Sequence, residues 1–250
     1  MADHLRVVKA KDAPAELGGF VATETAEDML RSLRLIRVQK GVRMTMIAGA
    51  PGTGKTTAVA RFASEVPEAI HVTAVRGEGS IYTVADLLLE VWGQATRNRT
   101  RTDVRRNLID NLAGTGAALL IDEAQHVEAD ALEWVRAMCE EARVDLALIG
   151  DHRLAPAVQA IPQLWSRMRR PVIVRRPTTG DVAGLARAAG VTDAPSIRAL
   201  TAVALRDGAL RNVESVLDLA ALFAGGGAIG TADLRAAIAD MKLGTVEALT

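Results

Sequence analysis

The chain has 250 residues with 30 basic and 30 acidic side chains, so its formal net charge is zero. Hydrophobic residues make up 49% and charged residues 24%, an ordinary globular composition that excludes a disordered or collagen-like chain. Zero net charge argues against a protein that binds polyanions through bulk charge, but it is compatible with a local basic stripe. Five of the basic residues are lysines, which leaves 25 arginines.

Features of secretion and membrane insertion are missing from the sequence. The N-terminal MADHLRVVKAKDAP has neither an apolar core nor a cleavage-site pattern. No run approaches the roughly 18 apolar residues that a membrane span needs. The single cysteine, Cys139, cannot form an internal disulfide, and its helical surroundings predict a small core residue. We therefore expect a cytoplasmic protein with no membrane contact.

Strands and helices are expected to alternate from residue 25 to residue 174, after an N-terminal arm at residues 1–20. Helices are predicted at residues 25–39, 56–66, 80–94, 103–112 and 129–142. Strands that are apolar throughout are predicted at residues 44–48, 70–74, 117–121, 146–149 and 172–174. Continuous apolar strands separated by helices indicate a five-stranded parallel sheet covered on both faces.

The pattern changes after Pro177, where only helical periodicity remains. Helices are predicted at residues 182–189, 196–206, 211–224 and 232–241, with glycines at the breaks. The sequence thus predicts an α/β core at residues 21–177 and a small all-helical domain at residues 178–250.

The strongest chemical signal is the segment Gly49-Ala50-Pro51-Gly52-Thr53-Gly54-Lys55-Thr56, which matches G-x-x-x-x-G-K-[ST] between a predicted strand and a predicted helix. Glycines let backbone N–H groups turn inward around a β-phosphate, and the helix N-terminus adds positive potential. Lys55 is expected to reach the β- and γ-phosphates, and the Thr56 hydroxyl to bind Mg²⁺. The predicted ATP contacts are Gly49, Ala50, Pro51, Gly52, Thr53, Gly54, Lys55, Thr56 and Thr57.

The second signal is an apolar strand that ends in two acids, Asp122 and Glu123. Asp122 is expected to hold the Mg²⁺ and its water shell, and Glu123 to orient and deprotonate an attacking water. This pair favours ATP hydrolysis. The stretch Asp122-Glu123-Ala124-Gln125-His126 is superficially similar to helicase motifs, but a helicase needs two such lobes and this length does not supply the second.

Weaker signals complete the predicted catalytic site. Asp151 follows a strand expected to lie between the two nucleotide-binding strands, so it would face the γ-phosphate as a sensor. Arg167, with Arg169 and Arg170 as alternatives, is the candidate for an arginine finger that reaches a neighbouring subunit. Arg211 opens a helix of the second domain, from which it would fold back onto the same phosphate.

Taken together, these segments resemble the AAA+ ATPases and, among them, the phage Mu transposition protein B group, relatives of the Tn7-type target-selection ATPases. The resemblance runs from about Phe20 to Gly244 and rests on GFVATETAEDMLRSLR, GAPGTGKT, LLIDEAQHVEADALEWVR, LALIGDHRL, LWSRMRR and GALRNVESVLDLAAL. It implies an ATPase that forms a helical oligomer on double-stranded DNA with ATP and presents target DNA to a transposase. The transposase in turn would stimulate hydrolysis.

Two departures from that group affect the expectations. The sensor position holds Asp151 where the group has Asn, so we expect slow hydrolysis and a faster turnover in Asp151→Asn. The match begins near Phe20 without the group's helix-turn-helix domain, so we expect DNA binding to come from the ATPase core.

Two segments of the core are candidates for DNA binding. One is the loop after the second predicted strand, which contains Arg76. The other is the arginine-rich segment with Arg97, Arg99, Arg101 and Arg105, which is equally compatible with a solvated loop. Phosphate contacts of this kind are independent of base sequence and sensitive to salt. Aromatic residues are only 3%, which disfavours base stacking on single strands.

Other functions remain as alternatives. A helicase loader or replication initiator of the same superfamily would be expected to carry a further binding domain. A P-loop kinase of small molecules would not need Glu123 beside Asp122. A secretion-linked ATPase would be expected to carry a membrane or peptidoglycan-binding segment.

Overall fold

The computed structural model describes residues 8–9, 19–38, 41 and 43–243. Backbone contacts group these residues into two compact units. The first consists of residues 29–48 and 56–173 with the short strand near the N-terminus. The second consists of residues 19–28, 49–55 and 174–243. Most of the predicted arm lies outside the described residues, and the predicted division into residues 21–177 and 178–250 stays a prediction.

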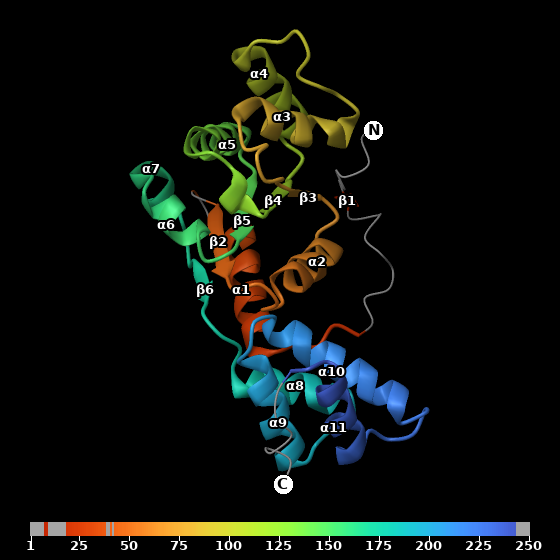
Figure 1. Cartoon of the computed structure of the whole chain (residues 1–250). Helices are drawn as coiled ribbons and strands as arrows, with labels where there is room; N and C mark the ends of the chain where they lie inside the picture. Colours follow the sequence, from red (N-terminus) through yellow and green to blue (C-terminus); the bar gives the residue numbers. More distant parts are fainter. Residues whose placement is uncertain (1–7, 10–18, 39–40, 42, 244–250) are drawn as a thin grey trace. The chain divides into compact units, whose positions relative to one another are not determined.

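The first unit is built on a sheet with the strand order β1-β3-β4-β5-β2-β6 (Figure 1). The strands are β1 (Val8–Lys9), β2 (Met44–Gly49), β3 (Ala69–Thr73), β4 (Ala118–Asp122), β5 (Asp145–Gly150) and β6 (Val172–Val174). The neighbours β3, β4, β5 and β2 pair in parallel. The predicted five-stranded parallel sheet is therefore confirmed, and β1 adds an unpredicted antiparallel strand beside β3.

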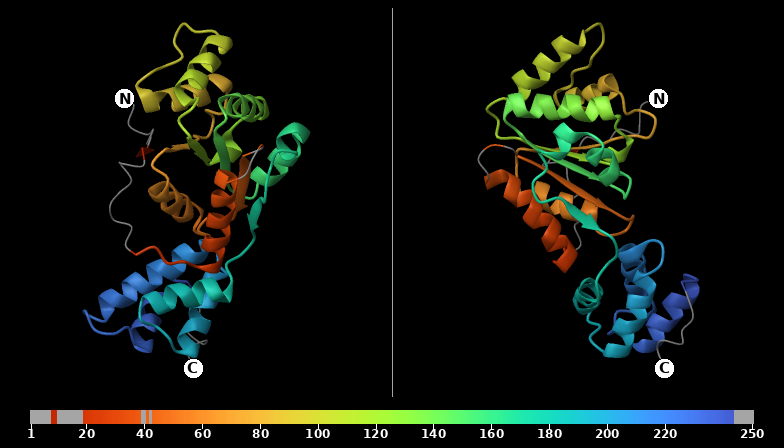
Figure 2. Two further views of the ribbon diagram at one scale, coloured as in Figure 1. Left: turned by 180° about the vertical axis from the view of Figure 1, so that it is seen from behind. Right: turned by 90° about the vertical axis from the view of Figure 1, so that its left-hand side faces the viewer.

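Helices cover both faces of this sheet, as the apolar strands require. On one face, Met46 and Leu148 share a core with buried side chains of α3 (Ile81–Leu89), α4 (Arg101–Leu112) and α5 (Ala129–Ala142). Side chains alternate along a strand, so Thr45 lies on the other face, where its hydroxyl bonds that of Ser32 in α1 at 2.7 Å. Figure 2 shows α1 (Glu24–Val38) and α2 (Lys55–Glu65) on the side of the sheet opposite to α3–α5. Cys139 is fully buried in the first core, as predicted.

Several helix boundaries differ from the sequence prediction, and two helices were not predicted. The predicted helix 80–94 is shorter, because α3 is followed by a 3-10 turn, η2 (Glu90–Trp92), which ends at Gly93 with φ 67°. Helix α4 begins at Arg101, where Thr100 and Asp103 form a capping box. Two short helices, α6 (Leu154–Gln159) and α7 (Pro162–Trp165), were not predicted.

The second unit contains four helices after β6, which confirms the predicted helical region. They are α8 (Thr179–Ala188), α9 (Ala194–Ala204), α10 (Ala209–Phe223) and α11 (Thr231–Asp240). Their shared core includes Val182, Leu200, Val213 and Leu234. Across the described residues, none of the helices has the length and apolar character that crossing a membrane requires.

The buried carboxylate of Asp181 links the segment that contains Thr25 to the helices that follow β6. Asp181 accepts hydrogen bonds from the N–H and hydroxyl of Thr25 at 2.8 and 2.6 Å, and from the N–H of Thr178 at 2.8 Å. Burial alone would raise the pKa of Asp181, but the bonds from Thr25 and Thr178 outweigh it and leave the pKa below its usual value. The ionised Asp181 thus fixes the start of α1 to the start of α8.

Candidate functional site

The phosphate-loop segment has the backbone that its glycines predict. Gly52 and Gly54 adopt φ values of 78° and 83°, in the left-handed region where a side chain would be strained. Lys55 is buried, and its Nζ donates to the carbonyls of Gly49 at 2.8 Å and Ala50 at 2.9 Å. The loop therefore holds a buried ammonium group at the N-terminus of an 11-residue helix, a favourable place for phosphate.

Within the second unit, the loop also contacts the start of α10. The N–H of Leu210 donates to the carbonyl of Gly52 at 2.9 Å. A Cβ at Gly52 would lie 1.9 Å from the oxygen of Gly208 and 3.4 Å from the Cβ of Arg211, so glycine is the residue that permits this approach. The structure therefore brings Arg211, the predicted second sensor, beside the phosphate loop.

The two predicted metal ligands lie together in the first unit. The hydroxyl of Thr56 donates to Oδ2 of the buried Asp122 at 3.1 Å. The N–H of Glu123 donates to the other oxygen of Asp122 at 2.8 Å, and Nε2 of His71 lies 3.8 Å from Oδ2. Burial would raise the pKa of Asp122, but His71, the Glu123 amide and Thr56 outweigh it and hold the pKa below its usual value. A hydroxyl and a carboxylate anion this close fit the oxygen ligands that Mg²⁺ prefers.

The predicted sensor follows the strand that the sequence indicated. β5 lies between β4 and β2 in the sheet, and Asp151 comes directly after it. The carboxylate of Asp151 accepts hydrogen bonds from the backbone N–H and from Nε of Arg153, both at 2.8 Å. Burial raises the pKa of Asp151, but the bonds from Arg153 outweigh it, so the pKa is below its usual value. The ionised Asp151 is therefore paired with Arg153, two residues further along the chain. The sequence prediction did not include this partner.

The finger candidates differ in their contacts. The Nε of Arg167, just after α7, donates to Oε1 of Glu140 at 2.7 Å, and its side chain is exposed. Arg169 is exposed as well. The carbonyl of Arg170 accepts a bond from Ser32 at 2.7 Å. The finger role of Arg167 stays a prediction, and its side chain would have to leave Glu140 to reach another subunit.

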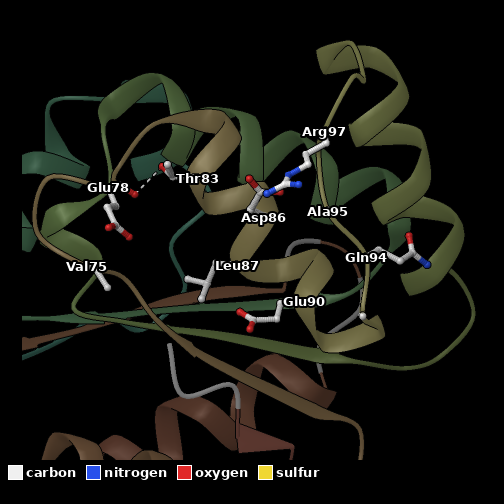
Figure 3. A pocket seen from close by; sticks show the side chains of 10 residues that line it. Val75, Glu78, Thr83, Asp86, Leu87, Glu90, Gln94, Ala95 and Arg97 are labelled. Carbon is white, nitrogen blue, oxygen red and sulfur yellow. Dashed lines mark hydrogen bonds between the residues drawn. The ribbon is translucent and has the colours of Figure 1, made fainter. Parts of the chain in front are cut away.

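The two candidate DNA-binding segments border one groove of about 640 Å³ (Figure 3). Val75, next to the exposed Arg76, lines one side, and Gln94, Ala95 and Arg97 line another. The groove also carries the carboxylates of Glu78, Asp86 and Glu90, and Figure 3 shows the Arg97 guanidinium pointing toward Asp86. The groove itself is therefore acidic, and Arg97 is the arginine among its lining residues.

The remaining arginines of this cluster have distinct surroundings. The guanidinium of Arg101 lies 5.7 Å from the ring centre of Tyr82, at cation–π distance. The guanidinium of Arg105 donates to Glu141 at 2.6 Å and to the carbonyl of Ala137 at 3.3 Å, so it braces α4 against α5. Arg99 is exposed. Of the predicted DNA contacts, Arg76, Arg97, Arg99 and Arg101 are thus exposed, and Arg105 is half-buried.

Two segments of this chain match families of known proteins. Residues 37–158 match a family described as AAA domain, and residues 166–241 match the family Mu B transposition protein, C terminal. The ATP-dependent target DNA activator B of Escherichia phage Mu is 27% identical over 213 residues, which cover 83% of this chain and 68% of that protein. The chain is thus an ATPase whose sequence is similar to the Mu B transposition proteins.

Another relative and two solved structures are also similar to this chain. The Mu-like prophage FluMu DNA transposition protein B of Haemophilus influenzae is 26% identical over 82% of this chain and 74% of its own length. The fold is shared with the ORC2 protein of Aeropyrum pernix, at a TM-score of 0.63 and 20% identity over 86% of this chain and 66% of that one. The ORC1 protein of the same organism, in complex with DNA, has a TM-score of 0.65 and 19% identity over 94% and 70%. The match to the AAA domain and the relatives named as ATP-dependent both support ATP as the nucleotide that this ATPase uses.

The contact between Thr56 and Asp122 generates a prediction about the metal. Thr56→Val keeps the size of the side chain but removes the oxygen, so we expect affinity for ATP with Mg²⁺ to fall about 10-fold or more. Affinity for ATP in the presence of a chelator should change little. Titration of a fluorescent ATP analogue with and without Mg²⁺ measures both. The control is Thr57→Val, which keeps the adjacent backbone N–H, and equal losses with and without Mg²⁺ would refute the metal assignment.

The pairing of Asp151 with Arg153 gives a second prediction. Asp151→Asn removes an anion from the sensor position, and we expect a severalfold rise in steady-state ATP turnover. Arg153→Ala leaves the Asp151 carboxylate without its cation, and turnover should fall. Steady-state ATPase assays at saturating ATP test the pair. An unchanged or lower rate in Asp151→Asn would contradict an inhibitory role for this carboxylate.

Proposed function

We propose that this chain is an ATP-dependent DNA-binding ATPase that self-associates on double-stranded DNA, as a helical oligomer or a ring, and delivers it to a transposase. The observation that carries the proposal is the bond between Thr56 and Asp122 beside Glu123, in a chain whose residues 166–241 match the Mu B transposition protein model. Relatives named ATP-dependent target DNA activator B support the choice of DNA as the partner. Since the DNA of a mobile element lies in the cytoplasm, we place the activity there.

In this proposal the nucleotide is held by the phosphate loop. The backbone N–H groups of residues 49–54, except Pro51, which has none, and of Thr57 surround the phosphates. The ammonium of Lys55 turns from its carbonyl partners to the β- and γ-phosphates. The oxygens of Thr56 and Asp122 hold Mg²⁺, directly or through water. When bound, Mg²⁺ neutralises charge on the β- and γ-phosphates.

Hydrolysis needs a base that accepts a proton from water. We assign this role to the carboxylate of Glu123, which follows Asp122 at the end of β4. As Glu123 takes the proton, the water oxygen bonds to the γ-phosphorus, the bond to the β–γ bridging oxygen breaks, and ADP leaves. Asp151 lies near this reaction as a sensor, and Arg211 adds positive charge from the start of α10.

Self-association supplies the last cation. Arg167 of one copy, or its neighbours Arg169 and Arg170, would reach the γ-phosphate bound by the next copy and stabilise the negative charge of the transition state. This arrangement makes hydrolysis depend on assembly, so DNA or a transposase that alters the assembly would alter turnover.

DNA binding is assigned to Arg76, which follows the groove residue Val75, to Arg97 in the groove lining, and to Arg99, Arg101 and Arg105 further along the chain, with Arg105 released from Glu141. They lie on elements of one unit, and Arg76 and Arg99 are exposed. Guanidinium groups contact phosphates without reading bases, so the binding should not depend strongly on sequence.

The assignment is tested by the variant with Arg76→Ala, Arg99→Ala and Arg101→Ala. We expect weaker ATP-dependent binding to duplex DNA, and a plot of log affinity against log salt that is flatter by about 0.9 per lost phosphate contact. Fluorescence anisotropy with a labelled duplex at several salt concentrations measures both quantities.

The matched control removes three exposed arginines of the second unit, Arg187, Arg198 and Arg206. It changes the net charge equally but should leave the salt dependence unchanged. Equal losses of DNA affinity in the two variants would show that bulk charge, and not these three arginines, binds DNA. Undiminished DNA binding by the first variant would refute the assignment of DNA binding to these arginines.

A further inference from the structure

The side chain of Gln125 lies between the predicted base and the predicted sensor. Gln125 belongs to the single turn η3 (Ala124–His126), which follows β4. Its Nε2 donates to Oε2 of Glu123 at 2.5 Å, and its Oε1 accepts the backbone N–H of Asp151 at 3.0 Å. The sequence prediction assigned no role to this residue.

The direction of these two bonds is fixed by chemistry. A backbone N–H only donates, so the amide oxygen of Gln125 must face Asp151. The amide nitrogen then has to face Glu123, whose ionised carboxylate only accepts. The end of β5 therefore determines how the Gln125 amide is oriented, and the amide in turn determines which oxygen of Glu123 is held.

Two backbone features of the same region fit this arrangement. Glu123 has a φ of 54°, in the left-handed region that non-glycine residues rarely adopt, and this bend starts the turn that brings Gln125 back toward β5. A Cβ at Gly150 would lie 2.3 Å from the Oε1 of Gln125, so the glycine leaves room for the amide. Backbone strain at a site indicates that the surrounding structure imposes that conformation.

We propose that Gln125 is a positioning residue for ATP hydrolysis: its amide holds one oxygen of Glu123 and leaves the other to accept the proton of the attacking water. The inference rests on the proposed role of Glu123 as the base. A carboxylate whose rotamer is fixed before the reaction does not lose that freedom in the transition state. Since Gln125 also accepts a bond from the backbone N–H of Asp151, any shift of the backbone after β5 would also shift Glu123.

The test compares Gln125→Met, which keeps the length of the side chain but lacks both polar atoms, with the wild-type chain. We expect kcat to fall about 10- to 100-fold, the usual effect of losing an orienting partner, while KM for ATP changes less than about twofold. Gln159→Met, an exposed glutamine on α6, is the matched control and should leave kcat unchanged. A wild-type kcat in Gln125→Met would overturn the inference.

A second pair of variants separates positioning from a loss of folding. Gly150→Ala places a methyl group against the Gln125 amide and should lower kcat, although it changes neither Gln125 nor Glu123. In Gln125→Ala the amide is gone, and adding Gly150→Ala should then lower kcat little further. If Gly150→Ala lowers kcat equally in the wild-type and Gln125→Ala backgrounds, Gly150 acts through other contacts, such as Leu154. This result would overturn the proposed role of Gln125.

The outcome for Glu123→Gln distinguishes the two levels of the proposal. If this variant retains full hydrolysis, the base assignment itself is wrong. If it loses hydrolysis while Gln125→Met retains it, only the role of Gln125 is wrong.

Discussion

The bond between the hydroxyl of Thr56 and the carboxylate of Asp122 joins two segments that are 66 residues apart in the sequence. It exists because β2, β5 and β4 run parallel, so that their carboxyl ends meet at one edge of the sheet. Ligands of open parallel sheets bind at this edge, outside the ends of the strands. Asp122, Glu123, Asp151 and the helix that carries Thr56 all follow such ends. The parallel pairing is therefore the constraint on which the site depends.

Much of this arrangement could be predicted from the sequence, since it depends on local patterns. Five apolar runs predicted the five parallel strands, and the glycine-rich segment predicted the left-handed turns at Gly52 and Gly54. The strand that precedes Asp151 was correctly expected between the two nucleotide-binding strands, since β5 lies between β4 and β2.

What escaped prediction depends on contacts between distant residues. β1 has two residues, and its pairing with β3 leaves no periodic pattern. The short helices α6 and α7 lack the length at which helical spacing can be recognised. The hydrogen bonds of Gln125 to Glu123 and Asp151 join residues up to 26 positions apart. Gly150, which leaves room for the Gln125 amide, was the one residue of the sequence that could have indicated this contact. A single glycine at the end of a strand is too common, however, to predict it.

The charge balance has a structural counterpart, because many arginines are paired with acids inside one unit. Arg37 and Arg43 contact the fully buried Asp145 at 2.7 and 2.6 Å, although burial still raises the pKa of this carboxyl group. Arg105 and Arg167 are similarly paired with Glu141 and Glu140. A neutral chain can therefore bind DNA through the few arginines that remain accessible, and the account predicts binding that is local and salt-sensitive.

The central claim is that ATP at the phosphate loop controls assembly on DNA. Electron microscopy of Glu123→Gln with duplex DNA and Mg²⁺, in ATP and separately in ADP, tests it most directly. Because this variant should bind ATP without hydrolysing it, the account predicts ordered oligomers along the duplex in ATP and bare duplex in ADP. Monomers in ATP, or equal coverage of the duplex in both nucleotides, would contradict it.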